Sequence, residues 1–202
     1  MATARNRLTI SISIYSAFLG SGANLIAVLA QTSHYEVAAR VSLVSTVWFC
    51  IFGAVGALLV VPISIYHFRE DPMKLRDLAT WPLLAFGFAV SWPFVTAAFF
   101  PVTLHFIVAI ENGYGLSVFL SALPDVILRG FNSFFIYGAA TIYTGILAGF
   151  VFGIGGIIID AIDVVSDRYS WRYASMVVSI ILGVSILCFS IFGPVELLNR
   201  FG

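Results

Sequence analysis

Hydrophobic and polar positions are arranged in long blocks, with extended apolar runs separated by short polar segments. Five of these runs are long enough to cross a bilayer as helices, which takes about 20 mostly apolar residues. Their expected bounds are 8–30, 41–66, 79–110, 131–160 and 174–192. The pattern predicts an all-α, polytopic transmembrane helical bundle that forms a single integral membrane domain over residues 1–202.

The third run is too long for one straight span. A helix over residues 79–110 would extend about 48 Å, whereas the hydrocarbon core is about 30 Å thick. The run contains Pro82, Pro93 and Pro101, and proline removes a helical hydrogen bond and crowds the preceding turn. We therefore predict a kinked helix that is broken near Pro93 or Pro101.

The segment 116–129 is apolar, but it is too short to cross the hydrocarbon core. It carries Asp125 four residues before Arg129, which is the spacing at which helical side chains meet. We predict an interfacial helix in which these two side chains pair at the water edge. A re-entrant segment that lines a cavity is the alternative.

The distribution of basic residues predicts the orientation in the membrane. With five spans and the N-terminus inside, seven of the ten lysines and arginines lie inside, and Arg40, Arg129 and Arg200 lie outside. The positive-inside rule therefore places the N-terminus inside. A sixth span between Pro101 and Pro124 gives the same ratio, so five spans are preferred on length alone.

Small residues form a stripe on the fourth run, within an arc of about 120° around the helix. The stripe consists of Thr141, Gly145, Gly149, Gly153 and Gly156. Such a glycine zipper lets membrane helices approach closely. The fifth run carries Ser175, Ser179 and Gly183 on one face. We predict an antiparallel hairpin of these two spans, with the glycine face packed on the last span or on a neighbouring subunit.

Three carboxylates, Asp160, Asp163 and Asp167, continue the same face at the end of the fourth run. Carboxylates in a bilayer are costly and often mark ion or proton pathways, and at a helix C-terminus they oppose the helix dipole. We expect a partner cation, which is Arg168 or Arg172, a residue of another subunit, or a metal ion. Structural pairing is the interpretation that we favour over partner docking and ion handling.

Other polar residues are scarce in the apolar runs. Asn24, Glu111 and Asp125 are the further candidates for contact with a partner, an ion or a solute. The chain has no nucleophile elbow, phosphate loop or HExxH motif, so we do not expect an enzyme. Its three histidines are not spaced along the runs to hold haem, and no cofactor is predicted.

Composition supports a membrane protein. Charged residues make up 10% of the chain, against about 25% in soluble domains, and the mean hydropathy is +1.03. Basic and acidic residues balance at ten each, which argues against nucleic-acid binding.

We expect a non-enzymatic subunit with a scaffolding or assembly role in a larger membrane complex, in a bacterial inner membrane or an equivalent organelle membrane. A small channel or carrier for an ion or small solute is the alternative.

Overall fold

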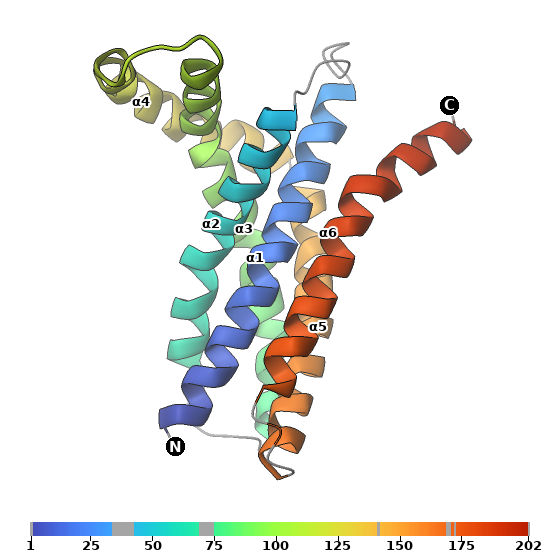
Figure 1. Ribbon diagram of the computed structural model, residues 1–202. Helices are drawn as coiled ribbons and strands as arrows, with labels where there is room; N and C mark the ends of the chain where they lie inside the picture. Colours follow the sequence, from blue (N-terminus) through green and yellow to red (C-terminus); the bar gives the residue numbers. More distant parts are fainter. Residues whose placement is uncertain are drawn as a thin grey trace.

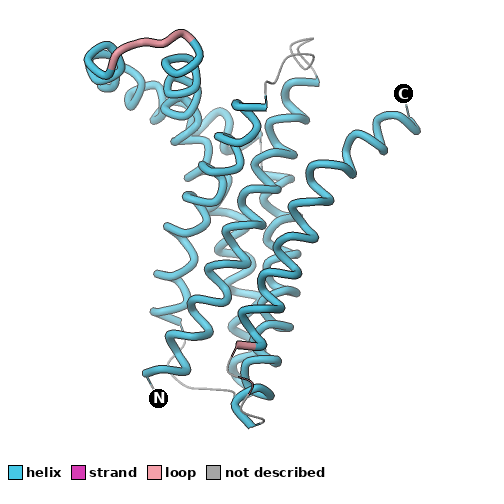
Figure 2. The backbone as a smooth tube through the Cα atoms, in the orientation of Figure 1, coloured by secondary structure: helices cyan, strands magenta, loops and turns pink. Residues whose placement is uncertain are grey.

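A computed structural model of the protein describes residues 2–33, 43–68, 75–140, 142–168, 171 and 173–201. Over these residues the chain is helical except for a turn at 112–115 and the short connection before the last helix (Figure 2). The helices are α1 (Ala2–Ser33), α2 (Leu43–Phe68), α3 (Leu75–Glu111), α4 (Leu116–Ala140), α5 (Ile142–Arg168) and α6 (Ala174–Phe201). The predicted all-α class is confirmed.

Four of these helices contain described stretches that are long and apolar enough to cross a membrane. The stretches are Asn6–Ile26, Thr80–Ala98, Ile142–Ser166 and Ala174–Phe192. Their outer faces carry large exposed apolar side chains, such as Phe86, Phe150 and Phe192, which lipid solvates and water does not. The chain is therefore an integral membrane protein. In α2 the described apolar stretch is shorter, Cys50–Val61, so the span count and the orientation stay predictions.

α1 lies at the centre of the bundle. It passes between α2 and α6 and also packs on α5, whereas α3 packs on α2, α4 and α5 (Figure 1). The starts of α1, α3 and α6 and the end of α5 lie together at the end of the bundle that carries the N-terminus. We call this the N-terminal end of the bundle.

Aromatic side chains fill the core between α1, α3 and α5. Phe152 of α5 stacks on Phe88 of α3 with ring centroids 4.7 Å apart, and it also contacts Trp81 at 6.1 Å. From α1, Tyr15 stacks on Phe152 at 6.4 Å and donates a hydrogen bond from its hydroxyl to the Val151 carbonyl at 2.7 Å. Because lipid is as apolar as these rings, van der Waals packing and the Tyr15 hydrogen bond hold the helices together here, and removal from water does not. These rings therefore tie the three central helices together.

α1 and α2 meet backbone to backbone at Gly20 and Gly53. A Cβ atom at Gly20 would collide with the Gly53 carbonyl, and one at Gly53 would lie 2.7 Å from the Cβ of Asn24. Such close approach is possible only without a side chain at both positions. This pair of glycines sets the position of α2 on α1.

The boundary between α4 and α5 corrects the predicted fourth span. The sequence pattern separates a helix over 116–129 from a span over 131–160, but the structure continues α4 to Ala140 and starts α5 at Ile142. Gly130 does not break α4. A Cβ atom there would lie 2.5 Å from the Ala98 carbonyl oxygen of α3, so the two helices approach closely at this point. The glycine is a contact point between α4 and α3.

α3 is one helix through all three of its prolines, so the predicted break near Pro93 or Pro101 is wrong. Pro93 has no N–H to donate to the Ala89 carbonyl. Both that carbonyl and the Pro93 ring face Gly145 of α5, where a Cβ atom would collide with each of them. The glycine accommodates the altered turn, and the helix continues.

α4 extends obliquely from the bundle at the end opposite the N-terminus and packs mainly on α3 (Figure 1). Asp125 and Arg129 are both exposed on it and form no ion pair with each other. The predicted pairing of these two side chains is therefore wrong. A stable exposed i,i+4 pair contributes only about 0.3–0.5 kcal/mol, so solvent or headgroups compete with it easily.

Candidate functional site

The glycine stripe of α5 faces α3, and the predicted packing on the last span or on a neighbouring subunit is wrong. A Cβ atom at Gly149 would lie 2.5 Å from the Cβ of Ala89 and 2.6 Å from the Ala85 carbonyl oxygen. One at Gly153 would lie 2.9 Å from the Cβ of Ala85, and one at Gly156 would collide with the Trp81 ring. α3 is the partner because its own small residues match the stripe. Thr141 lies outside the described residues.

The small residues of α6 face α1 and the end of α5. A Cβ atom at Gly183 would lie 2.5 Å from the Phe18 ring. Ser175 receives a hydrogen bond from the Ser11 hydroxyl of α1 at 3.1 Å, and Ser179 donates to the Ser175 carbonyl at 2.7 Å. All three serines are fully buried. The Ser179 bond lies within α6, whereas the Ser11–Ser175 bond joins α1 to α6, and hydroxyl bonds between helices help to hold membrane helices together.

An ion pair between α1 and α5 forms the centre of this polar region. Arg7 donates from Nε to Asp163 Oδ1 at 2.7 Å and from Nη2 to Oδ2 at 3.4 Å. Ser175 donates to the same Oδ1 at 2.9 Å. Asp163 is 5% exposed, and removing its charge from water is costly. A cation from α1 and a hydroxyl from α6 compensate for that cost.

A second buried carboxylate lies one turn earlier on α5. Asp160 is 5% exposed, and its Oδ2 accepts a hydrogen bond from the Trp81 indole N–H of α3 at 3.0 Å. The Trp81 ring lies against Gly156. We call the set Arg7, Ser11, Trp81, Asp160, Asp163 and Ser175 the polar cluster. It joins four helices at the N-terminal end of the bundle.

The helix dipoles explain part of this arrangement. Asp163 is in the last turns of α5, and the partial negative charge at a helix C-terminus disfavours a carboxylate there. Its hydrogen bond to Ser175 places it at the first turn of α6, where the partial positive charge favours one. The Arg7 guanidinium adds a full positive charge beside the carboxylate.

The structure does not bring the remaining predicted site residues together. Asn24 is buried beside Gly53 in the α1–α2 contact. Glu111, at the end of α3, and Asp125, on α4, are both exposed. The side chain of Asp167 lies outside the described residues. A solute path through Asn24, Glu111 and Asp125 therefore gains no support from their placement.

The cation that the carboxylates needed is Arg7, which the sequence pattern treats only as a flanking charge. The side chains of Arg168 and Arg172 lie outside the described residues, and the described pair of Asp163 is with α1. The signal available in the sequence was the position of Arg7, directly before the first apolar run and one helical turn before Ser11. Trp81 was missed because tryptophan near a span end is typical of the interface belt.

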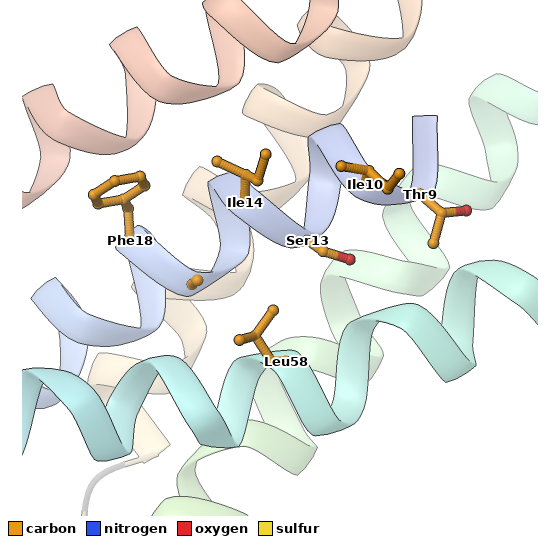
Figure 3. Close-up of a pocket in the computed structure, with 7 residues that line it drawn as sticks. Thr9, Ile10, Ser13, Ile14, Phe18 and Leu58 are labelled. Carbon is orange, nitrogen blue, oxygen red and sulfur yellow. The ribbon is translucent and has the colours of Figure 1, made fainter. Parts of the chain in front are cut away.

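A shallow groove lies on the outer face of α1 beside α2 (Figure 3). It has a volume of about 380 Å³, and Ile10, Ile14, Phe18 and Leu58 provide most of its wall. None of the polar-cluster residues lines it. Within the described part of the chain, no three His, Cys, Asp or Glu side chains lie close enough to hold a metal ion.

Comparison with known proteins identifies no similar protein. No family model matches the chain, and neither a curated protein nor a solved structure matches it. The polar cluster and the packing of the bundle therefore carry the functional argument.

Replacing Trp81 with phenylalanine tests the polar cluster. The change removes the indole N–H from the buried Asp160 carboxylate, and loss of a hydrogen bond to a charged group costs about 1.5–3 kcal/mol. We expect the free energy of unfolding in detergent to fall by that amount. Trp171→Phe, at a residue that is 72% exposed, is the matched control and should change it by less than about 0.5 kcal/mol. Equal effects of the two variants would contradict a structural bond to Asp160.

Proposed function

We propose that this chain is a non-enzymatic integral membrane subunit with a scaffolding or assembly role in a larger membrane protein complex. The observation that carries the proposal is the internal bonding of the polar cluster. Both buried carboxylates are held by side chains of other helices within the chain, so they close the bundle, and neither lines the groove beside α1. A preorganised, closed bundle is suited to supporting partners.

We assign partner contact to α4, because the glycine stripe is already covered by α3. α4 packs mainly on α3 and exposes apolar side chains in the part whose side chains are described, up to Phe135. The most exposed are Leu116, Ile127, Leu128, Phe131 and Phe135. It also exposes Asp125 and Arg129. Exposed aromatic residues beside an arginine are typical of protein–protein interfaces.

Location and orientation follow as part of the same proposal. The membrane is a bacterial inner membrane or an equivalent organelle membrane, and the N-terminal end of the bundle faces the inside. The balance of basic residues supports this orientation. α4 then lies at the outer side, where its charged side chains reach headgroups or a partner.

The test is recovery of partners from the native membrane in mild detergent. On a native gel the chain should migrate as a complex well above its own mass of 22.0 kDa. Phe131→Ala on α4 should reduce the recovered partner about tenfold or more, as loss of an interface anchor does. Phe189→Ala on α6 is the matched control, since the two rings are 67% and 62% exposed.

Two outcomes would contradict the proposal. Migration of the wild-type chain alone would argue against a complex. Equal recovery with Phe131→Ala and Phe189→Ala would argue against α4 as the contact.

A small channel or carrier is the second candidate. The buried polar atoms Trp92 Nε1 and Thr96 Oγ1 favour it, because both lie in the apolar stretch of α3 without a hydrogen-bond partner among the described residues. Liposomes that contain the purified chain alone distinguish the two functions. Flux of ions or small solutes above empty liposomes would support the carrier, and its absence supports the assembly role.

A further inference from the structure

A group of aromatic rings joins α2, α3 and α4 at the end of the bundle opposite the N-terminus. The rings are Trp48 and Phe52 of α2, His105 and Phe106 of α3, and Phe119 of α4. We call this set the aromatic junction. It is separate from the polar cluster and from the core that surrounds Phe152.

Phe106 is the ring that contacts both neighbouring helices. Its centroid lies 4.6 Å from that of Trp48, with the ring planes at 84°, and 5.8 Å from that of Phe119, with the planes at 75°. Edge-to-face pairs of this kind are directional and stabilise more than their contact area alone predicts. Phe52 lies 6.5 Å from Phe106, and His105 stacks on Phe119 at 5.1 Å. A change in the angle between α4 and α2 would separate these paired rings.

α4 has few other contacts that could fix its tilt. Among the described residues it packs on α3 and, over a short stretch, on α5, and it extends obliquely from the bundle (Figure 1). It meets the α3 backbone closely at Gly130, which lies against the Ala98 carbonyl. Beyond Ala98, the rest of α3 and the start of α4 form a helical hairpin that is closed by the turn at 112–115. We call residues 99–130 the α3–α4 hairpin.

Pro101 lies at the base of this hairpin. It has no N–H, so the Ala97 carbonyl lacks the helical donor that normally comes four residues later, and prolines are common sites of helix bending. α3 continues through Pro101, but the missing hydrogen bond makes a change in tilt easier there than in a regular helix. Contacts beyond Pro101 are therefore needed to fix the tilt, and Phe106 follows it by five residues.

We propose that the aromatic junction sets the tilt of the α3–α4 hairpin, with Phe106 as the positioning residue, and thereby orients the partner-contact side chains of α4. Because α4 is one helix, a change in its tilt moves Leu116 and Leu128 together, and these side chains are 72% and 69% exposed. The setting of the tilt does not depend on the proposed assembly role, whereas the orienting of a partner contact rests on it.

The test measures the distance between spin labels at Tyr114→Cys, in the turn of the hairpin, and Tyr143→Cys, at the start of α5, in an otherwise cysteine-free chain. The two tyrosines are 53% and 81% exposed, so both positions accommodate a label. The helix from Pro101 to Glu111 is about 15 Å long, so a change in tilt of about 20° moves the turn by about 5 Å. Phe106→Ala should change the distance by about that amount.

Two further variants separate positioning from general stability. Trp48→Leu removes the α2 side of the contact while α3 and α4 stay intact, and it should change the distance in the same way even if Phe106→Ala does not fold. Phe88→Ala is the matched control, because it makes the same substitution on α3 at a ring that is 2% exposed and stacks on Phe152 at 4.7 Å. It should lower Tm at least as much as Phe106→Ala and leave the distance unchanged.

An unchanged distance in both Phe106→Ala and Trp48→Leu would overturn the proposal. So would an equal change in Phe88→Ala, because the distance would then report general loss of packing. Recovery of partners from the native membrane should fall about fivefold or more with Phe106→Ala and not with Phe88→Ala. A wild-type chain without partners would overturn the assembly role alone, whereas a changed distance with full partner recovery would overturn only the orienting of the partner contact.

Discussion

Replacing Gly149 with leucine should separate α5 from α3 and destabilise the isolated chain. Even the first carbon of the new side chain would lie 2.5 Å from the Cβ of Ala89 and 2.6 Å from the Ala85 carbonyl oxygen. Overpacking typically costs 1–3 kcal/mol, and a contact with backbone leaves less room for relaxation. We expect a loss of about 3 kcal/mol or more, which lowers Tm by about 6–12 °C for a chain of this size.

The matched control for this change is Gly87→Leu. It introduces the same side chain into α3, at a position where a Cβ atom meets nothing within 4 Å. Removing a helical glycine there should leave Tm unchanged or raise it slightly. Thermal unfolding of both variants in one detergent gives the comparison. If Gly149→Leu kept the wild-type Tm and lost only its partner proteins, the stripe would face another subunit and the contact with α3 would be wrong.

Replacing Arg7 with methionine should have the second large effect. It leaves the buried Asp163 carboxylate without the cation that lies 2.7 Å from it, and breaking a buried ion pair from one side costs about 3–5 kcal/mol. Asp163→Met removes the other partner and should cost a similar amount. We expect the variant that carries both changes to lose less than the sum, because no uncompensated charge remains.

The free energies of unfolding of the two single variants, the double variant and the wild type form a double-mutant cycle. Arg129→Met, at an exposed arginine on α4, is the control for loss of a positive charge and should change stability by less than about 0.5 kcal/mol. Additive losses at Arg7 and Asp163 would show that the two side chains do not interact energetically.

The glycine stripe of α5 and its contact with α3 show what can be predicted about a helix contact from sequence alone. Gly145, Gly149 and Gly153 repeat at helical spacing, and a close helix contact follows from that repeat alone. The repeat does not reveal which helix makes the contact. That depends on Ala85 and Ala89, which lie in a segment whose three prolines predict a break. α5 does contact its neighbour α6, as the predicted hairpin requires, but its glycine stripe lies on α3.

The polar cluster shows the same limit. The need for a cation beside Asp163 follows from the cost of a buried carboxylate. Arg7 and Asp163 are 156 positions apart, and no local pattern connects positions so distant. Tyr15 and Gly155 are a further case: a Cβ atom at Gly155 would collide with the Tyr15 ring, although neither residue belongs to a repeat.

The sequence by itself determined the all-α class, the apolar helices that enter the membrane, and the faces on which helices approach closely. These properties depend on hydropathy and spacing within one segment, and each segment carries them independently of the others. Only the tertiary structure decided that α3 covers the glycine stripe, that α1 holds the centre, and that Arg7 neutralises Asp163. Those outcomes depend on which distant surfaces fit in shape and charge, and that is a property of pairs of helices and not of any single one.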